Sequence, residues 1–457
     1  MKKYFILDIK DKVGEEVELY GWVNSIRDHK KVVFIDLRDR SGVVQLVGDQ
    51  QLSSLSPEDV VCVKGIVKQR PDHLVNPNLE TGRIEVEVKA FEKLSSADVL
   101  PFEIGDSGYD LDEQIRLKYR YLDLRRERMK RNLFFRQKVL SYVRNYLVEK
   151  GFWEVETPIL TKSTPEGARD FIVPSRLKKG KFYALPQSPQ QYKQLLMVAG
   201  VERYFQIARC FRDEDPRADR AYGEFTQIDI EMSFVAEDEV RGLVEQMIIN
   251  LVKEVFPEKT IMQTPFPVID YQTAMKQYNS DRPDIRKKQD ENVLAFCWIV
   301  DFPAFEWSEE EKRWTTVHHP FTSPKKEDLK YLDSGEFGKV RAQQYDLVLN
   351  GFEVAGGSIR ITDPELQSKI FQIMGHKKSD VEAKFGHLLK AFSYGVPPHG
   401  GIAIGFDRLL QVILNERSVR EVIAFPATSG GVTAVMSAPD TVSDQQLKEL
   451  GIAVVED

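Results

Sequence analysis

The stretch YDLVLNGFEVAGGSIR (residues 345–360) decides the fold of the larger part of the chain. Apolar residues alternate with others on both sides of Asn350-Gly351, a pair that signals a two-residue β-hairpin turn. In that register Val348 faces Glu353, and Asp346 lies one diagonal step away on the same face, so the two carboxylates lie roughly 5–8 Å apart. The stretch therefore predicts two antiparallel strands that carry paired acids.

Paired acids at this spacing indicate a cation site. Like charges so close call for a counter-charge, and oxygen ligands beside phosphates suit Mg²⁺. We expect Gly356-Gly357 to form a β-bulge that turns Arg360 onto the same face as Asp346 and Glu353. The alternative is a hairpin whose acids simply face water, and Arg360 weighs against it.

Outward from the hairpin, the pattern predicts an α+β domain in the second part of the chain. Strands alternate with helices without a regular βαβ repeat, which favours an antiparallel sheet. Apolar residues from Leu133 to Leu147 recur at helical spacing, and Gly151 follows as a C-cap. We expect this domain to cover residues 125–457, after a hinge at 94–124 that contains Pro101 and Gly105.

The first 93 residues predict a small closed barrel. Five short strands are expected at residues 17–24, 32–37, 43–47, 60–67 and 84–88, separated by turn signals. Five strands in this span suit an OB-fold barrel, a fold that commonly binds single-stranded nucleic acid. Any other small β-barrel is nearly as compatible with the pattern alone.

Composition excludes several classes of protein. The net charge of −7 argues against a general polyanion binder, so we expect no DNA partner and only local RNA contacts. The basic run at residues 118–131 is interpreted as a solvated helix face. Cys62, Cys210 and Cys297 lie too far apart for a disulfide framework or a metal knuckle. Neither a signal peptide nor a membrane-spanning run is visible, so we expect a cytoplasmic location and no membrane partner.

Three further segments of the second domain carry polar groups that suit a ligand. SPQQ (residues 188–191) predicts a helix start with a capping box, which places Gln190 and Lys193 on one face. FRDED (211–215) and EFTQIDIE (224–231) read as two strands joined by a charged loop, a plausible nucleotide clamp. GGIAIGFDR (400–408) leads from a strand into a helix whose first turn holds Arg408, where phosphate is favoured. Each segment taken alone is as compatible with a solvated surface.

Together these segments resemble the class II aminoacyl-tRNA synthetases, in particular the aspartate enzymes of the bacterial type. The resemblance rests on motifs at residues 151–158, 211–231 and 400–410, with further matches at 164–170, 187–193, 318–324 and 353–360. It implies a six-stranded antiparallel catalytic sheet, a homodimer and an OB domain that reads the anticodon. Between residues 286 and 297 the bacterial type usually carries an inserted domain, and we expect that domain to be absent here.

The resemblance implies that the chain uses ATP and Mg²⁺ to activate L-aspartate and to load it onto tRNA. Lys193 and Arg360 would hold the side-chain carboxylate of aspartate, and Asp229 and Gln190 its ammonium group. Two cations facing a neutral asparagine amide would lack a counter-charge, which would reject asparagine. The full aspartate-binding set is Glu166, Ser188, Gln190, Lys193, Arg212, Gln227, Asp229, His318, His319 and Arg360.

The nucleotide and metal assignments follow from the same resemblance. Arg212 would grip the α-phosphate, Glu214 and Phe225 the adenine, and Arg408 the γ-phosphate and the outer face of the base. Asp346 and Glu353 would hold Mg²⁺, and Arg212, Arg408 and Glu353 are the catalytic residues, with no protein nucleophile required. The full ATP-binding set is Arg212, Asp213, Glu214, Phe225, Glu353, Gly405, Phe406, Asp407 and Arg408.

In the barrel, the resemblance assigns anticodon contacts to Arg27, Phe34 and Gln45, and tRNA discrimination to His29 and His73. His29 stands where relaxed family members, which charge tRNA(Asp) and tRNA(Asn), often have histidine and strict ones leucine. Relaxed charging, strict charging of tRNA(Asp) and a non-catalytic RNA-binding paralogue all remain open. The asparagine and lysine enzymes and an ammonia-dependent asparagine-forming relative are the nearest rivals, although a lysine pocket would need acids in place of Lys193 and Arg360.

Overall fold

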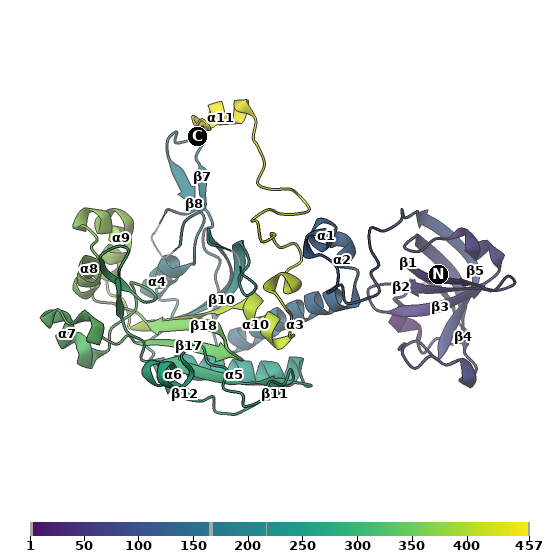
Figure 1. Cartoon of the computed structure of the whole chain (residues 1–457), viewed down its shortest axis with the longest axis horizontal. Coiled ribbons are helices and arrows are strands. Elements are labelled where there is room, and N and C mark those ends of the chain that lie inside the picture. Colours follow the sequence, from purple (N-terminus) through teal and green to yellow (C-terminus); the bar gives the residue numbers. More distant parts are fainter. Residues whose placement is uncertain (1–2, 164–167, 216, 456–457) are drawn as a thin grey trace. The chain divides into compact units, whose positions relative to one another are not determined.

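The computed structural model describes residues 3–163, 168–215 and 217–455 (Figure 1). The chain forms two compact units, Met1–Glu103 and Ile104–Asp457. Among the described residues, no helix is long and apolar enough to cross a membrane. All three cysteines are buried, and none of them forms a disulfide bond with another described residue.

The first unit is a closed five-stranded barrel with the strand order β1-β2-β3-β5-β4, which confirms the predicted OB fold. Apolar side chains that alternate along the strands, among them Val17, Leu19, Ile35 and Leu46, fill its interior. Its strands are β1 (Glu16–Asp28), β2 (Val33–Arg38), β3 (Val43–Gly48), β4 (Val60–Gln69) and β5 (Ile84–Ser95), with short 3₁₀ helices η1 (Ile6–Ile9), η2 (Gln50–Ser54) and η3 (Asp72–Leu74).

The second unit is built on an eight-stranded sheet with the order β12-β14-β17-β18-β19-β10-β9-β6. The six central strands are antiparallel, as predicted, and two short edge strands pair in parallel with β14 and β9. The strands are β6 (Trp153–Glu154), β9 (Arg203–Arg212), β10 (Gly223–Ser233), β12 (Val268–Asp270), β14 (Phe296–Val300), β17 (Gln344–Leu349), β18 (Phe352–Ile359) and β19 (His399–Gly405).

Three two-stranded sheets and the helices complete this unit. Two-stranded sheets are formed by β7 (Ile172–Pro174) with β8 (Phe182–Ala184), β11 (Thr260–Ile261) with β13 (Val293–Leu294), and β15 (Phe305–Ser308) with β16 (Arg313–Thr316). The helices are α1 (Glu113–Lys118), α2 (Arg120–Asp123), α3 (Glu127–Glu149), α4 (Gln190–Val198), α5 (Glu237–Val255), α6 (Tyr271–Tyr278), α7 (Leu329–Ser334), α8 (Pro364–Ile373), α9 (Lys378–Phe392), α10 (Phe406–Ile413) and α11 (Asp444–Leu450).

One face of the large sheet is apolar and packs on the core, and the other face is polar. Ile228 and Ile230 of β10 and Ile402 and Ile404 of β19 join the main apolar core with α3, α5 and α10. Because strand side chains alternate between faces, the intervening residues of the same strands point to the opposite face. That face carries the polar residues of the predicted site.

The hairpin of β17 and β18 has the predicted turn, with positive φ at Asn350 and Gly351, and the predicted pairing of Val348 with Glu353. The predicted bulge at Gly356-Gly357 is wrong. Leu347 pairs with Ala355 and Val348 with Glu353, so the extra residue is Val354. The two glycines instead stay in regular pairing, and a Cβ on Gly357 would approach the carbonyl oxygen of Gly401 to 2.4 Å.

The basic run at 118–131 is not a solvated face. Arg120 and Arg126 are buried and bond to Asp123, while Arg116 and Arg128 reach Glu421 at 2.6 Å and 2.9 Å. Since Glu421 lies far along the sequence, the run by itself gave no sign of this network. The contacts bind α1 and α2 to the second unit, so most of the segment expected to be a hinge belongs to that unit.

Candidate active site

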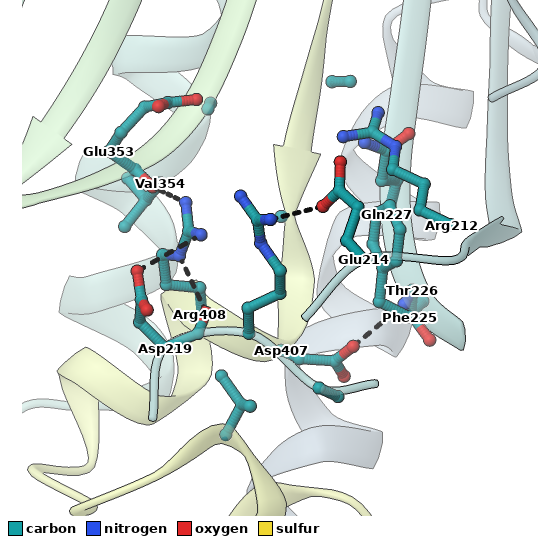
Figure 2. Close-up of a pocket in the computed structure, with 16 residues that line it drawn as sticks. Arg212, Glu214, Asp219, Phe225, Thr226, Gln227, Glu353, Val354, Asp407 and Arg408 are labelled. Carbon is teal, nitrogen blue, oxygen red and sulfur yellow. Dashed lines mark hydrogen bonds and ion pairs between the residues drawn. The ribbon is translucent and has the colours of Figure 1, made fainter. Parts of the chain in front are cut away.

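Two adjoining cavities open on the polar face of the sheet. The first is lined by Lys193, Asp229 and Arg360 among others, and the second by Glu214, Phe225 and Arg408 (Figure 2). The residues common to both walls are Arg212, Gln227, Glu353 and Ala403. A ligand in one cavity therefore meets a ligand in the other at Arg212.

The two predicted carboxylate-binding cations lie together in the first cavity. Lys193 Nζ is 2.6 Å from Asp229 Oδ1 and 3.2 Å from Glu231 Oε2. Arg360 donates from Nε and Nη2 to the two oxygens of Glu231, at 2.9 Å and 3.0 Å, and from Nη1 to Ser358 Oγ at 2.7 Å. Glu231 thus joins both cations in one buried cluster.

Glu231, which the sequence did not indicate as a site residue, supplies a counter-charge to both cations. Arg360 has five N–H donors and Lys193 three. Among the described residues, their bonds leave one N–H on each terminal nitrogen of Arg360 and one on Nζ of Lys193. A carboxylate can therefore be bound without breaking the cluster.

Burial and charge set the protonation of the two acids in opposite directions. The neighbouring Arg360 and Lys193 outweigh the burial of Glu231 and lower its pKa to about 2, so it stays ionised. Burial raises the pKa of Asp229, and Lys193 offsets only part of that effect. Asp229 therefore gains from a further positive group beside it.

Several buried polar atoms in the wall of the first cavity lack a partner within the described parts of the chain. They include Asp229 Oδ2, Gln190 Nε2, Arg212 Nε and His319 Nε2. A buried polar atom left unpaired is costly, which points to a ligand. Burial lowers the pKa of His319, and its Nδ1 accepts a bond from Phe321 N at 3.3 Å, so the neutral ring carries its proton on the unpaired Nε2.

The remaining predicted residues of this cavity are placed as follows. Ser188, Gln227 and His318 line it, and burial lowers the pKa of His318. Helix α4 begins at Gln190 with Pro189 as its N-cap, so the predicted capping box from Ser188 to Gln191 is wrong by one residue. Glu166 lies outside the described residues.

The second cavity has the shape of a nucleotide clamp. Arg408 donates to the carbonyl oxygens of Asp219 and Glu353 at 3.1 Å and 2.6 Å, which holds its guanidinium at the cavity wall (Figure 2). Arg212 lies over the ring of Phe225, with the guanidinium carbon 5.1 Å from the ring centre. Glu214 forms an ion pair with Arg220, a residue that the sequence analysis did not assign.

Three predicted ATP-binding residues have structural contacts of their own. Asp407 lines the cavity but accepts bonds from Thr226 N at 2.8 Å and from Arg136 Nη1 at 2.5 Å. The side chain of Phe406 is buried in the apolar core and does not line the cavity. Asp213 accepts a bond from Tyr222 at 3.2 Å and likewise lies outside the lining, whereas Gly405 is part of it.

Asp346 and Glu353 converge at Gly356. A Cβ on Gly356 would lie 3.1 Å from Asp346 Oδ1 and 3.6 Å from Glu353 Oε1, so only glycine leaves this space open. Burial and the charge of Glu353 raise the pKa of Asp346 well above its usual value. The described residues contain no group of three or more metal-ligating side chains, and two carboxylates suit Mg²⁺, which binds largely through phosphates and water.

In the barrel, three predicted anticodon-binding residues lie side by side. Arg27 pairs with Phe34 across β1 and β2, and Arg27 Nη2 donates to Gln45 Oε1 at 3.1 Å. The ring of His29 meets that of Phe34 edge to face at 5.6 Å between centres. His73 is exposed in η3.

The fold and the two cavities define a class II tRNA synthetase. The family described as tRNA synthetases class II (D, K and N) matches residues 112–429, and the OB-fold nucleic acid binding domain matches 17–94. Among solved structures, the asparaginyl-tRNA synthetase from Pyrococcus horikoshii complexed with asparaginyl-adenylate has a TM-score of 0.75 at 21% identity, covering 94% of this chain and 98% of that one. At this identity the likeness shows the fold alone.

Relatives of higher sequence identity show which family of class II tRNA synthetases this chain belongs to. The aspartate–tRNA(Asp/Asn) ligase of Dictyoglomus turgidum is 42% identical over 97% of this chain and 96% of its own length, and that of Thermotoga maritima is 41% identical over 97% of each. The chain therefore belongs to the aspartate–tRNA ligases, and it is an enzyme rather than a non-catalytic paralogue. The first alignment spans 574 positions whereas this chain has 457 residues, so that relative carries residues which this chain lacks. The expected absence of an inserted domain between residues 286 and 297 stays a prediction.

Proposed function

We propose that this enzyme charges both tRNA(Asp) and tRNA(Asn) with aspartate. Two observations support relaxed charging. The relatives cited above are named for both tRNAs. In addition, the ring of His29 contacts the ring of Phe34, beside the residues assigned to anticodon binding. An aromatic ring at this position can contact more than one kind of base.

The proposed reaction is supported by the two cavities, which share Arg212 in their walls. Aspartate in the first cavity directs its α-carboxylate towards the α-phosphorus of ATP in the second. Arg212 stabilises the charge on the phosphate oxygens at that junction. Attack releases pyrophosphate and forms aspartyl-adenylate. The 3′-hydroxyl of tRNA then attacks the acyl carbon of the adenylate, takes the aspartyl group and releases AMP.

Aspartate is held through donors and acceptors that the cluster leaves available. The spare N–H groups of Lys193 and Arg360 bind its side-chain carboxylate. The unpaired Asp229 Oδ2 accepts from its ammonium group, which supplies the positive neighbour that this buried acid lacks. Asparagine would offer an amide N–H₂ where these cations need an acceptor, which leaves a donor facing donors.

The nucleotide is held by side chains that already have fixed positions. Phe225 stacks on the adenine, Glu214 binds the base edge, and Arg408 neutralises the terminal phosphate. Mg²⁺ would be held by Asp346 and Glu353, and when bound it neutralises the phosphate charge that develops during transfer. Since Asp346 is buried and lies close to the half-buried Glu353, a cation also relieves their mutual repulsion.

A homodimer is part of this proposal. The edge strand β6 exposes Trp153 to 64%, and Ile159 and Leu160, which follow it, are about half exposed. An uncovered apolar edge of this kind favours a second copy of the chain. Charging of tRNA also supports the cytoplasmic location expected from the sequence.

The experiment that tests relaxed charging compares aminoacylation of tRNA(Asp) and tRNA(Asn) transcripts with labelled aspartate. We expect both to be charged, and we expect His29→Leu to lower charging of tRNA(Asn) more than that of tRNA(Asp). His73→Leu serves as a matched variant at the second assigned histidine. Absence of aspartyl-tRNA(Asn) at enzyme levels that fully charge tRNA(Asp) would overturn the proposal of relaxed charging.

A further inference from the structure

The hairpin of β7 and β8 carries a concentration of positive charge that the site does not use. Residues 171–184 read FIVPSRLKKGKFYA, with four cations and no acid, in a chain whose net charge is −7. Arg176, Lys178, Lys179 and Lys181 are all exposed. Within the described residues none of the four forms an ion pair, in contrast to the buried arginines of the 118–131 run. We call residues 171–184 the basic arm.

The tip of the basic arm has a defined conformation. Ser175 N donates to Lys181 O at 2.9 Å, Lys181 N donates to Lys178 O at 2.9 Å, and Lys178 N donates to Ser175 Oγ at 3.2 Å. Gly180 has a φ of +73°, which a glycine adopts without strain. The four cations are therefore held on a closed loop, so that little backbone freedom is lost when a partner binds.

The C-terminal end of α11 supports this loop. A Cβ on Gly451, which follows α11, would lie 3.3 Å from Lys179 Cδ, so the aliphatic stem of Lys179 packs against the chain there. Figure 1 shows α11 beside the end of the hairpin. The stem therefore has a neighbour at Gly451 although Lys179 is exposed, a common use of lysine at binding surfaces.

The arm is rooted beside the nucleotide cavity. Leu185 N donates to Phe171 O at 2.9 Å, and Phe211 N donates to Pro186 O at 2.9 Å, which ties the base of the arm to β9. Phe171 also meets the ring of Tyr222 edge to face at 6.1 Å. Tyr222 and Arg212 lie at the two ends of the loop that joins β9 and β10. The arm therefore begins next to this loop, whose residues line the second cavity.

We propose that the basic arm binds the phosphate backbone of the tRNA near its 3′ end. This inference rests on the proposed transfer of aspartate to tRNA. A tRNA must bring its terminal hydroxyl to the cavity junction, and the phosphates leading to it need counter-charges close to that point. Four cations that form no ion pair among the described residues, on a loop closed by its own hydrogen bonds and rooted there, supply those counter-charges, which a neutral partner would leave unused.

The test is a variant with Arg176, Lys178, Lys179 and Lys181 replaced by glutamine. A matched control replaces four exposed lysines outside the arm that form no ion pair with other described residues, namely Lys287, Lys288, Lys377 and Lys378. Each phosphate contact contributes about 0.7 to 0.9 to the slope of log affinity against log salt, so four contacts amount to about 3. We expect the arm variant to lose up to about 3 from that slope for tRNA binding, and to show at least a tenfold higher KM for tRNA at 0.15 M salt.

A second measurement separates this inference from folding and from the proposed function. ATP–pyrophosphate exchange with aspartate requires no tRNA, so it should be unchanged in the arm variant and in the control. An arm variant with a normal salt slope and tRNA KM would overturn the inference, and so would a shift to monomers in sedimentation, which would make the arm an interface between copies. Failure of the unmodified enzyme to support aspartate-dependent exchange would instead overturn the proposed function.

Discussion

Replacement of Lys193 by methionine is the perturbation that most sharply separates the two tasks of this residue. Methionine keeps the apolar stem and removes the ammonium group, which bonds to Asp229 at 2.6 Å and Glu231 at 3.2 Å. Both acids are fully buried, so each loses a counter-charge. Removal of one partner from a buried ion pair costs about 3–5 kcal/mol of folding free energy.

The same replacement removes one charge-assisted bond to the side-chain carboxylate of aspartate. Such a bond contributes about 1.5–3 kcal/mol, which corresponds to about a 10- to 150-fold loss in kcat/KM for aspartate. Pyrophosphate exchange at varied aspartate concentration measures that loss, and urea unfolding measures stability. The KM for ATP should change little, because Lys193 does not line the nucleotide cavity.

The double variant Lys193→Met with Asp229→Asn provides the control. It removes the acid left unpaired by the single change, so we expect it to regain part of the lost stability. It should not regain activity with aspartate, because Asp229 is also the acceptor for the substrate ammonium group. The reasoning is refuted if the single variant keeps kcat/KM for aspartate within threefold, or if the double variant regains activity together with stability.

Three further predictions follow from named contacts. Arg136→Lys should raise the KM for ATP about tenfold or more and change the KM for aspartate less. The reason is that a single ammonium group cannot take the place of the guanidinium fork, which bonds to Asp407, Thr226 and Val422 O at once. An unchanged KM for ATP would contradict the role of Arg136 in positioning Asp407. Asp346→Asn should raise the Mg²⁺ concentration for half-maximal exchange at least tenfold, and an unaltered Mg²⁺ titration would count against the assigned carboxylate pair. The ionised Glu231 side chain stabilises the fold by about 3 kcal/mol above its usual pKa of 4.5, and this stabilisation is lost as pH falls through its folded-state pKa of about 2. The unfolding free energy of Glu231→Gln should therefore depend less steeply on pH between these two values than that of the unmodified enzyme. Equal slopes would show that the ion pairs with Glu231 do not lower its pKa.

The parts of the fold that could be predicted depend on local rules. Turn chemistry at Asn350-Gly351 fixed the hairpin and the pairing of Val348 with Glu353, because that turn admits few registers. Alternation along β10 separated its apolar residues from its polar ones, which placed the site on one face of the sheet. The bulge at Val354 escaped prediction because it depends on pairing with neighbouring strands rather than on the glycines nearby.

The residues that escaped prediction depend on partners distant in sequence. Glu231 looked like another polar residue of an alternating strand until Arg360, 129 positions away, supplied its counter-charge. Arg128, which belongs to the basic run at 118–131, bonds to Glu421 across 293 positions, and the sequence alone could not show that contact. The sequence led to no prediction for the cations of residues 176–181, and only the closed conformation of their loop and the absence of ion pairs with other described residues distinguish them.

We propose that the cluster of Lys193, Arg360 and Glu231 accepts a small diacid beside a bound nucleotide. Pyrophosphate exchange with ATP and each of aspartate, asparagine and lysine tests it most directly, since this first step needs neither tRNA nor the barrel. We expect exchange with aspartate alone. Exchange that is as fast with asparagine, or absent with aspartate in the presence of Mg²⁺, would contradict it.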